Sequence, residues 1–577
     1  MKKIIYASLI IGTIITSKKD ITAQELQFST SKDEIRTKEN GYFSRVSSVT
    51  SKYVYVLYEG KKSKFYSIAA YSKADLKKVG EKMFNTEEKS KYGKLEIAKI
   101  LYFDDVVYVF WKDKKPDKEL ALYVESFSPE MKSMKKLTKV YAVQNNKKIP
   151  PALFVVGNFK ASKLLIGAEL SREKEENVTV EYKVLNNDFS FGASGQITLP
   201  VKTPKMSQKN DNLVSSYLYE ENEVLYIFTN IKNEDDNSKI KYYTMLTILK
   251  PSLNAFKTIP VKADSKKLYD IGVLAKSDKT YIVAMYSDLT KDPSGNDIHG
   301  IFLADVDNDL LALNNANFIP FGKSFLDQLF EKDKSDKNKA GVLSSKKKKK
   351  SAEESISGNY NIMKIFKADG NSIYLIAAKY TTYTIQQCYY TNNTYQCYTK
   401  TVTDAGNVLS FKINLNGTIE WSTLIKRSTG YSGVVDNDMS LFLYNNKIYG
   451  FIPALEPINF NEIKDKKQRK AAMKEASKMI SYAVIDGSNG NVSVKKQRIG
   501  LLSDNDKKIF YYNVIKGDDE KNLFSVLYYN TMEKKQRMLV YAYLSCIIIP
   551  PAGLIAIPII MLKPIQETIN LCKITIQ

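Results

Sequence analysis

Two cysteines in the second half of the chain, Cys388 and Cys397, are spaced for a disulfide. They flank a polar segment, Thr-Asn-Asn-Thr at residues 391–394, which is typical of a hairpin turn and places the two thiols on facing arms. In an oxidising compartment such a pair forms a disulfide, whereas metal ligation needs donors that the neighbouring sequence does not offer. The sequence therefore predicts a Cys388–Cys397 disulfide. Cys546 and Cys572 lie in the apolar tail, where they either pair or stay buried.

The single histidine, His299, limits the catalytic chemistry that this chain can perform. A histidine-dependent serine or cysteine triad has to use it, and no Gly-x-Ser-x-Gly elbow accompanies it. The histidine count also excludes a metal centre built from several histidines. We interpret His299 as a loop histidine beside a strand.

Alternating carboxylates at Asp305, Asp307 and Asp309 resemble the start of a calcium-binding loop. That loop requires glycine and glutamate where this chain has Leu310 and Ala316, so the signature fails. Asp-Asn-Asp triplets recur at residues 436–438 and 504–506, and turn formation explains all three segments. No glycine-rich phosphate loop, dinucleotide fingerprint or zinc spacing is present. The sequence thus predicts no metal and no cofactor, and its catalytic residues, if it has any, are unknown.

A two-strand unit that recurs eight times provides the elements that position these residues. Each unit is an apolar strand, a short polar turn and a second strand with an apolar or aromatic centre. Over the first five units the central residues are 53 to 61 positions apart, which marks a repeat array. The eight central residues are Tyr55, Tyr108, Leu165, Tyr226, Ile282, Tyr374, Tyr449 and Phe524.

A third strand follows each unit, so that one repeat suits one propeller blade. These strands are predicted at residues 65–71, 121–127, 178–185, 242–249, 301–305, 408–413, 480–485 and 538–543. The sequence therefore predicts an all-β protein, a β-propeller of seven or eight blades, over residues 24–545. Closure of the ring is expected from the segment around residues 25–31 or from the tail after Ser545. Tandem β-sandwiches are the alternative fold.

The N-terminus predicts export. Residues 1–23 contain Lys2 and Lys3, an apolar run over 4–16 and Ile-Thr-Ala at 21–23, which is the pattern of a secretory signal peptide cleaved after Ala23. The charged residues at 18–20 leave an uncleaved membrane anchor as the alternative. A periplasmic, cell-surface or secreted location follows.

The charge of +23 favours anionic partners. Only seven of the 86 basic residues are arginine, however, and Lys is enriched together with Asn, Ile and Tyr. An AT-rich genome produces this composition without selection for binding, and Lys is the poorer residue for bidentate phosphate recognition. We therefore interpret the charge as compositional and do not expect a nucleic-acid ligand.

Two insertions and a tail interrupt the repeat. Residues 332–357 are polar and contain a five-lysine run at 346–350, which predicts a disordered loop. Residues 461–479 are rich in helix formers and predict a basic helical insertion. The apolar tail, residues 546–577, has an uncharged stretch over 546–562 with three prolines. We expect a closing strand and a buried extension there, with a membrane anchor as the alternative.

These observations predict an exported binding or scaffold propeller without catalysis, whose partner is a protein or glycan. We expect contact through two loops, because rim loops commonly carry function in such folds. The candidate contact residues are Tyr383, Tyr389, Tyr390, Tyr395 and Tyr398 in the first loop and Lys466, Lys467 and Arg469 in the second. The alternative function is a carbohydrate-active hydrolase or lyase with acidic residues in the central funnel.

Overall fold

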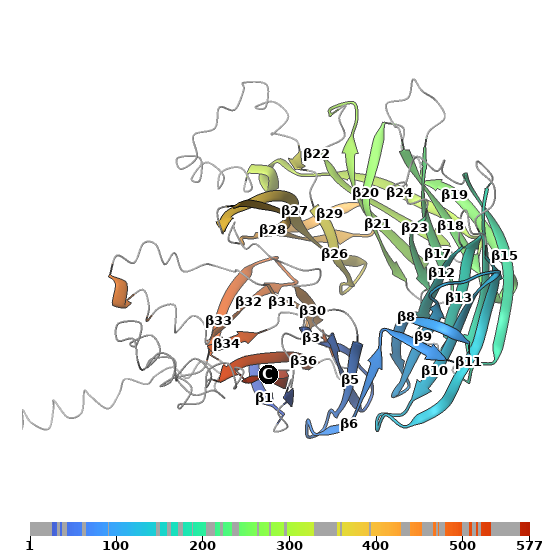
Figure 1. Cartoon of the computed structure of the whole chain (residues 1–577). Coiled ribbons are helices and arrows are strands. Elements are labelled where there is room, and N and C mark those ends of the chain that lie inside the picture. The colour runs from blue at the N-terminus through green and yellow to red at the C-terminus, as the bar shows by residue number, and fades with distance from the viewer. Residues whose placement is uncertain are drawn as a thin grey trace, which may run out of the picture.

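The strands form eight antiparallel sheets arranged in a ring, an eight-bladed β-propeller (Figure 1). The computed structural model describes residues 26–31, 35–36, 43–59, 65–90, 92–145, 151–158, 163–170, 177–186, 188–202, 214–219, 223–232, 242–261, 265–275, 279–292, 297–307, 309–327, 355–357, 360–391, 394–427, 439–452, 465–468, 471, 479–498, 507–510, 515–516, 521–531 and 566–577. The propeller prediction is confirmed, with eight blades.

Each blade is a meander of four main strands, which we call its first to fourth strands. Blade 1 contains β3 (Phe43–Val49), β4 (Tyr53–Glu59), β5 (Phe65–Ser72) and β6 (Lys78–Asn85). Blade 2 contains β8 (Gly93–Phe103), β9 (Val106–Asp113), β10 (Glu119–Phe127) and β11 (Ser133–Gln144), with the short β7 (Glu87–Ser90) paired to β8. Blade 3 contains β12 (Ala152–Asn158), β13 (Lys163–Leu170), β14 (Asn177–Asn186) and β15 (Phe191–Lys202).

The middle blades follow the same plan. Blade 4 contains β16 (Val214–Tyr219), β17 (Leu225–Lys232), β18 (Tyr242–Lys250) and β19 (Ala255–Val261), with the 3-10 helix η1 (Pro251–Leu253) between the last two. Blade 5 contains β20 (Lys266–Ala275), β21 (Lys279–Asp288), β23 (Gly300–Asp307) and β24 (Ala312–Pro320). Blade 6 contains β26 (Tyr360–Lys367), β27 (Ser372–Thr391), β28 (Thr394–Asn414) and β29 (Thr418–Ile425). A separate two-stranded sheet pairs β22 (Asp297–Ile298) with β25 (Ile356–Ser357).

Blade 7 contains β30 (Ser440–Tyr444), β31 (Lys447–Phe451), β32 (Met479–Asp486) and β33 (Val492–Arg498). Blade 8 joins the two ends of the chain. Its strands are β34 (Lys507–Phe510) with β35 (Ile515–Lys516), then β36 (Asn522–Thr531), β37 (Gln566–Ile576) and β1 (Leu26–Thr30), while β2 (Ile35–Arg36) also pairs with β37.

The ring closes where β1 pairs with β37 in antiparallel register, from Leu26 opposite Ile576 to Thr30 opposite Cys572. In Figure 1 the N-terminal β1 lies beside the C-terminal β36 and the marked C-terminus. Both segments named as candidates for closure thus contribute to it. The contact with blade 7 is strengthened by Gln497, whose side-chain amide donates to the Leu26 carbonyl.

The hydrophobic core lies between blades, because the second strand of each blade is buried on both faces. All eight predicted central residues are buried on these strands. One cluster combines Phe110 of blade 2 with Ile166 of blade 3, and another combines Leu303 of blade 5 with Phe411 of blade 6. Burial of such a side chain stabilises the fold by about 1.5–3 kcal/mol, so each blade depends on its neighbours.

The structure corrects the predicted third strand of the last blade. The strand that pairs with β36 is β37, whereas residues 538–543 lie outside the described residues. Because β36 pairs with β34 and β35 along its other edge, no edge of it remains for residues 538–543. The propeller therefore extends past residue 545 to Ile576. Cys572, on β37, is buried and pairs with no cysteine among the described residues, which do not include Cys546.

The insertions fall partly outside the described residues. The prediction of a disordered loop at 332–357 is wrong for residues 355–357. There β25 pairs with β22, and Ile356 is buried in the core between blades 5 and 6. Within 461–479, residues 466–468 are helical, as expected. The signal peptide at 1–23 lies outside the described residues. No helix among the described residues is long and apolar enough to cross a membrane.

Candidate functional site

The propeller has two ends, and the connectivity decides which segments meet at each. Because successive strands of a blade are antiparallel, connections between first and second strands, and between third and fourth strands, lie at one end, which we call the turn face. Connections between second and third strands, and from one blade to the next, lie at the opposite end, the loop face.

Contacts between neighbouring blades confirm that their turns share one face. The Tyr182 hydroxyl of blade 3 donates to Asn254 Oδ1 of blade 4 over 2.7 Å. Lys250 of blade 4 forms a 3.0 Å ion pair with Asp309 of blade 5. At the loop face, β22 from within blade 5 pairs with β25 from the connection to blade 6. The two faces are therefore separate surfaces, each built by many blades.

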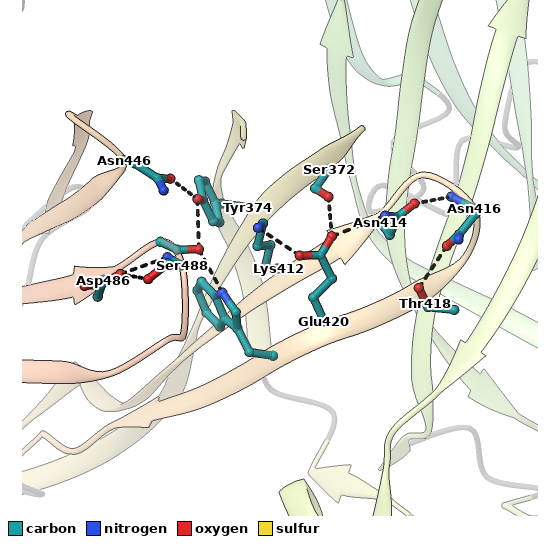
Figure 2. Close-up of polar contacts among 12 residues, drawn as sticks. Ser372, Tyr374, Lys412, Asn414, Asn416, Thr418, Glu420, Asn446, Asp486 and Ser488 are labelled. Carbon is teal, nitrogen blue, oxygen red and sulfur yellow. Dashed lines mark hydrogen bonds and ion pairs between the residues drawn. The ribbon is translucent and has the colours of Figure 1, made fainter. Parts of the chain in front are cut away.

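The turn face between blades 6 and 7 contains a polar network (Figure 2). Tyr374, a predicted repeat centre on β27, donates to Asn446 Oδ1, and its hydroxyl oxygen lies 3.1 Å from the Gly487 carbonyl oxygen. Trp421 on β29 donates its indole N–H to the same carbonyl over 3.0 Å. Asn446 and Gly487 belong to two different turns of blade 7. One tyrosine and one tryptophan thus join blade 6 to both turns of blade 7.

Related bonds join other pairs of blades. The Tyr55 hydroxyl of blade 1 donates to the Asp105 carbonyl of blade 2 over 2.8 Å. The Tyr226 hydroxyl of blade 4 and the Thr280 hydroxyl of blade 5 are 2.6 Å apart. Asp104 and Asp105, like Asn445 and Asn446, have positive φ angles, which Asn and Asp tolerate in a tight turn. The sequence indicated these turns correctly, but not that Tyr55 and Tyr374 bind the turn of the next blade.

The carboxylates of this network are held ionised rather than poised for proton transfer. Glu420 is paired with Lys412 over 2.8 Å and also accepts from Asn414 and Ser372. The Lys412 and Ser372 hydrogen bonds lower the pKa of Glu420, and the Ser488 side chain and backbone lower the pKa of Asp486. A carboxylate with such donors is a poor general acid. We conclude that the network in Figure 2 is structural.

The central axis of the ring is lined by the first strands, since β12 lies beside β16 and β20 beside β26. Register shifts mark a bulge in five of these strands, namely β3, β8, β16, β20 and β26. Bulges kink a strand and re-aim its side chains. On the described first strands, carboxyl side chains are limited to Glu96 in blade 2 and Asp270 in blade 5.

Asp270 occupies the bulge of β20, with a φ of 41°. Its carboxylate accepts a hydrogen bond from the backbone N–H of Ile362 on β26, which ties blade 5 to blade 6. Desolvation raises the pKa of Asp270 above its usual range, although its surface is exposed. A strained residue with a raised pKa at the axis is a functional candidate. The sequence analysis did not identify Asp270, because a bulge has no strong sequence signal.

The predicted disulfide lies in a long arm of blade 6. We define the arm as residues 380–391 and 394–405, where β27 and β28 pair only with each other beyond the blade. Cys388 and Cys397 are register partners in it, as are Tyr390 and Tyr395. Antiparallel partners have Cα atoms about 4.5–5.5 Å apart, within the range of about 4.4–6.8 Å that disulfides span.

Both predicted contact loops start and end at the loop face, in adjacent blades. The arm with Tyr383, Tyr389 and Tyr398 connects the second and third strands of blade 6, and residues 452–478 connect those of blade 7. Lys466 and Lys467 are exposed, whereas Arg469 and the arm side chains lie outside the described parts.

The remaining chemical candidates have structural roles. His299 is buried, and its Nδ1 accepts a hydrogen bond from the Asp288 backbone N–H over 3.2 Å. Asp307 accepts from the backbone N–H groups of Asp309 and Leu310, which confirms the turn interpretation. The triplets at 436–438 and 504–506 lie outside the described residues. Within the described residues, no three His, Cys, Asp or Glu side chains are grouped closely enough to hold a metal ion.

Comparisons with known proteins assign neither a family nor a function to this chain. The sequence matches no protein-family model and no curated protein. Among solved structures, the WD40 domain of SCAP from fission yeast is similar with a TM-score of 0.36 and 7% identity, covering 96% of this chain and 98% of that one. Polysaccharide lyase Uly1 is similar with a TM-score of 0.33 and 10% identity, covering 83% and 89%.

The β-propeller domain of the Trilobed protease from Pyrococcus furiosus is similar with a TM-score of 0.30 and 8% identity, covering 66% of this chain and 97% of that domain. These similar structures include a WD40 domain, a lyase and part of a protease. The likeness therefore carries no argument about what this chain binds or transforms.

Replacement of Tyr374 by Phe tests the junction between blades 6 and 7. The variant removes a hydroxyl that donates to Asn446 Oδ1 and lies beside the Gly487 carbonyl, so we expect the free energy of unfolding to fall by about 1–2 kcal/mol in denaturant titrations. Tyr269→Phe is the matched control, because the buried Tyr269 hydroxyl has no hydrogen-bond partner among the described residues. Equal effects of the two variants would contradict the assigned role of Tyr374.

The Asp270→Asn variant tests the raised pKa. A carboxyl whose pKa is higher in the folded state costs stability once it ionises, above the folded-state pKa, and costs nothing below the unfolded-state pKa. We therefore expect the variant to be more stable than the wild type at neutral pH, with a difference that disappears in acid. Asp486→Asn is the control. Because the pKa of Asp486 is lowered in the folded state, we expect this variant to be less stable than the wild type at neutral pH. Thermal melting across pH measures both, and a pH-independent Asp270→Asn effect contradicts the assignment.

Mass spectrometry of protein isolated under non-reducing conditions tests the disulfide. We expect one linked peptide pair containing Cys388 and Cys397. Because the bond joins two residues within the arm, Cys388→Ser should leave the melting temperature unchanged while making residues 380–405 more sensitive to protease. Complete alkylation of both thiols in protein isolated from native cells would show that the prediction is wrong.

Proposed function

We propose that this protein is an exported β-propeller that binds a partner through its loop face and acts by binding rather than catalysis. The observation that supports this most is the convergence of the arm and the 452–478 connection at one end of two adjacent blades. Both segments exceed what the blades need, since the corresponding connections of blades 1 and 2, residues 60–64 and 114–118, are only a few residues long. Loops set on a rigid scaffold commonly form binding surfaces.

Export fits the way in which the ring closes. A cleavage after Ala23 removes the apolar segment but leaves β1, which begins at Leu26, intact in the mature chain. The strand that closes the propeller is thus retained after processing. The paired positions of Cys388 and Cys397 also suit an oxidising compartment.

Binding is favoured over carbohydrate cleavage by the carboxyl groups at the axis. Retaining and inverting glycosidases place two carboxyl groups about 5–9.5 Å apart. The two carboxyl residues of the described first strands, Glu96 and Asp270, belong to blades 2 and 5, and Asp270 already binds the backbone of Ile362. This distribution gives no support for a catalytic pair there.

Loop replacement tests the proposal. One variant joins Lys379 to Gly406 through an Asn-Gly turn in place of the arm, and a second replaces residues 461–479 with a Gly/Ser linker. The control changes Leu253→Ser and Leu310→Ser, whose side chains are exposed at the turn face. Crosslinking on native cells followed by mass spectrometry should identify partners that both the wild type and the control capture. At least one loop variant should capture these partners in a yield about tenfold or more lower.

Thermal melting establishes that each variant is folded. Capture of the same partners, in the same yield, by both folded loop variants would contradict the assignment of the loop face. A mature N-terminus at Gln24 is the expected result for export, and retention of residues 1–23 would contradict cleavage.

A further inference from the structure

Exposed apolar side chains gather at the outer rim of the turn face. In the part of the chain that the structure describes, six large apolar side chains are exposed, by 44% to 70% of their surface. Five of them lie in, or within two residues of, the connections between the third and fourth strands of blades 2 to 5. We call these five the apolar arc: Met134, Phe191, Leu253, Phe256 and Leu310. Such a group marks an interaction surface, whereas single exposed apolar residues are normal.

Contacts between neighbouring blades make the arc continuous. The Lys135 ammonium of blade 2 donates to the Asp188 carbonyl oxygen in the turn of blade 3. The helix η1 of blade 4, which contains one residue of the arc, packs beside β15 of blade 3, which begins at another. The ion pair from Lys250 to Asp309 connects blade 4 to blade 5. Four consecutive blades thus build one apolar surface.

The arc is basic at its blade 2 end. Lys132, Lys135 and Lys136 are exposed there around Met134, and the one carboxylate among residues 128–136 is Glu130. Met134 and Lys136 lie on the same face of β11, because alternate residues of a strand share a face. This end therefore combines an exposed apolar side chain with positive charge.

The blade 5 end is acidic. Asp305, Asp307 and Asp309 outnumber the lysines near them, which are Lys250, paired with Asp309, and Lys279, paired with Asp305. Backbone N–H groups of the turn donate to Asp307 and lower the pKa of its carboxyl group, which keeps it ionised. The two ends of the arc thus have opposite charge.

We propose that the apolar arc pairs with the arc of a second copy of this chain, forming a dimer with two-fold symmetry. In a two-fold contact one surface meets itself in reverse, so blade 2 of one protomer faces blade 5 of its partner. The lysines of one end then lie opposite the aspartates of the other, and the apolar side chains of blades 3 and 4 pack together. Complementary charge fixes this register, whereas a rim of uniform charge would repel its copy.

The dimer goes beyond the proposed function and does not rest on it. Because the arc lies at the turn face, association through it leaves both loop faces accessible. The dimer presents two loop faces, so a partner with repeated sites is bound with higher avidity than by one protomer.

Sedimentation equilibrium of the chain from Gln24 onward tests the dimer. We expect the wild type to form a dimer, and Leu253→Ser with Leu310→Ser to raise the Kd about tenfold or more, because anchors of this kind carry much of the binding energy. Met83→Ser is the matched control and should leave the Kd unchanged, since this sixth exposed apolar residue lies in blade 1, outside the arc. A wild type that stays monomeric at about 100 μM, or that forms an open series of larger oligomers, would overturn the proposal.

Charge reversal tests the register, with thermal melting to show that each variant is folded. Lys132→Glu with Lys136→Glu should weaken the dimer about tenfold, Asp309→Lys should weaken it as well, and the triple variant should regain affinity because opposite charges face each other again. Lys115→Glu with Lys118→Glu changes the charge of blade 2 equally, but at its loop-face connection, and should leave the dimer unchanged. Equal losses in the two lysine pairs, or no regain in the triple variant, would overturn the two-fold arrangement.

Discussion

The pairing of β1 with β37 is the constraint on which the rest of this structure depends. A blade cannot bury its second strand alone, and the clusters between blades show that each sheet completes the core of its neighbours. A ring of such sheets is stable when its last blade meets its first, and here that requires the two ends of the chain to share a sheet. The N-terminal strand is the outermost strand of the blade whose other strands are C-terminal. Folding of the ring therefore awaits the last residues of the chain.

Closure also explains why composition alone does not reveal the role of the apolar stretch near the C-terminus. With β37 placed beside β36, everything between them becomes a connection within blade 8. The same principle applies to the arm and to residues 452–478, which are connections within blades 6 and 7. Once the strand order is known, these three unusual segments belong to one face. Bonds from one blade to the turns of the next, such as that from Tyr374 to Asn446, stabilise the opposite face.

Much of the fold could be predicted from local sequence, because each blade repeats a buried strand that is apolar on both faces. Residues such as Tyr226 and Ile282 identify these strands, and Asp104, Asp105, Asn445 and Asn446 identify the turns. The last blade was misassigned because residues 538–543 have the composition of a strand, and nothing local distinguishes them from β37. The bulge at Asp270 and the bonds between blades depend on which strands become neighbours, which local sequence does not specify.

The acidic composition of the turn face, whose connections contain seven Lys and fourteen Asp or Glu residues, follows from the same topology. Short turns need Asp and Asn for backbone geometry, so the face made of turns becomes acidic for conformational reasons. The long connections have no such requirement and accumulate the lysines that dominate the composition.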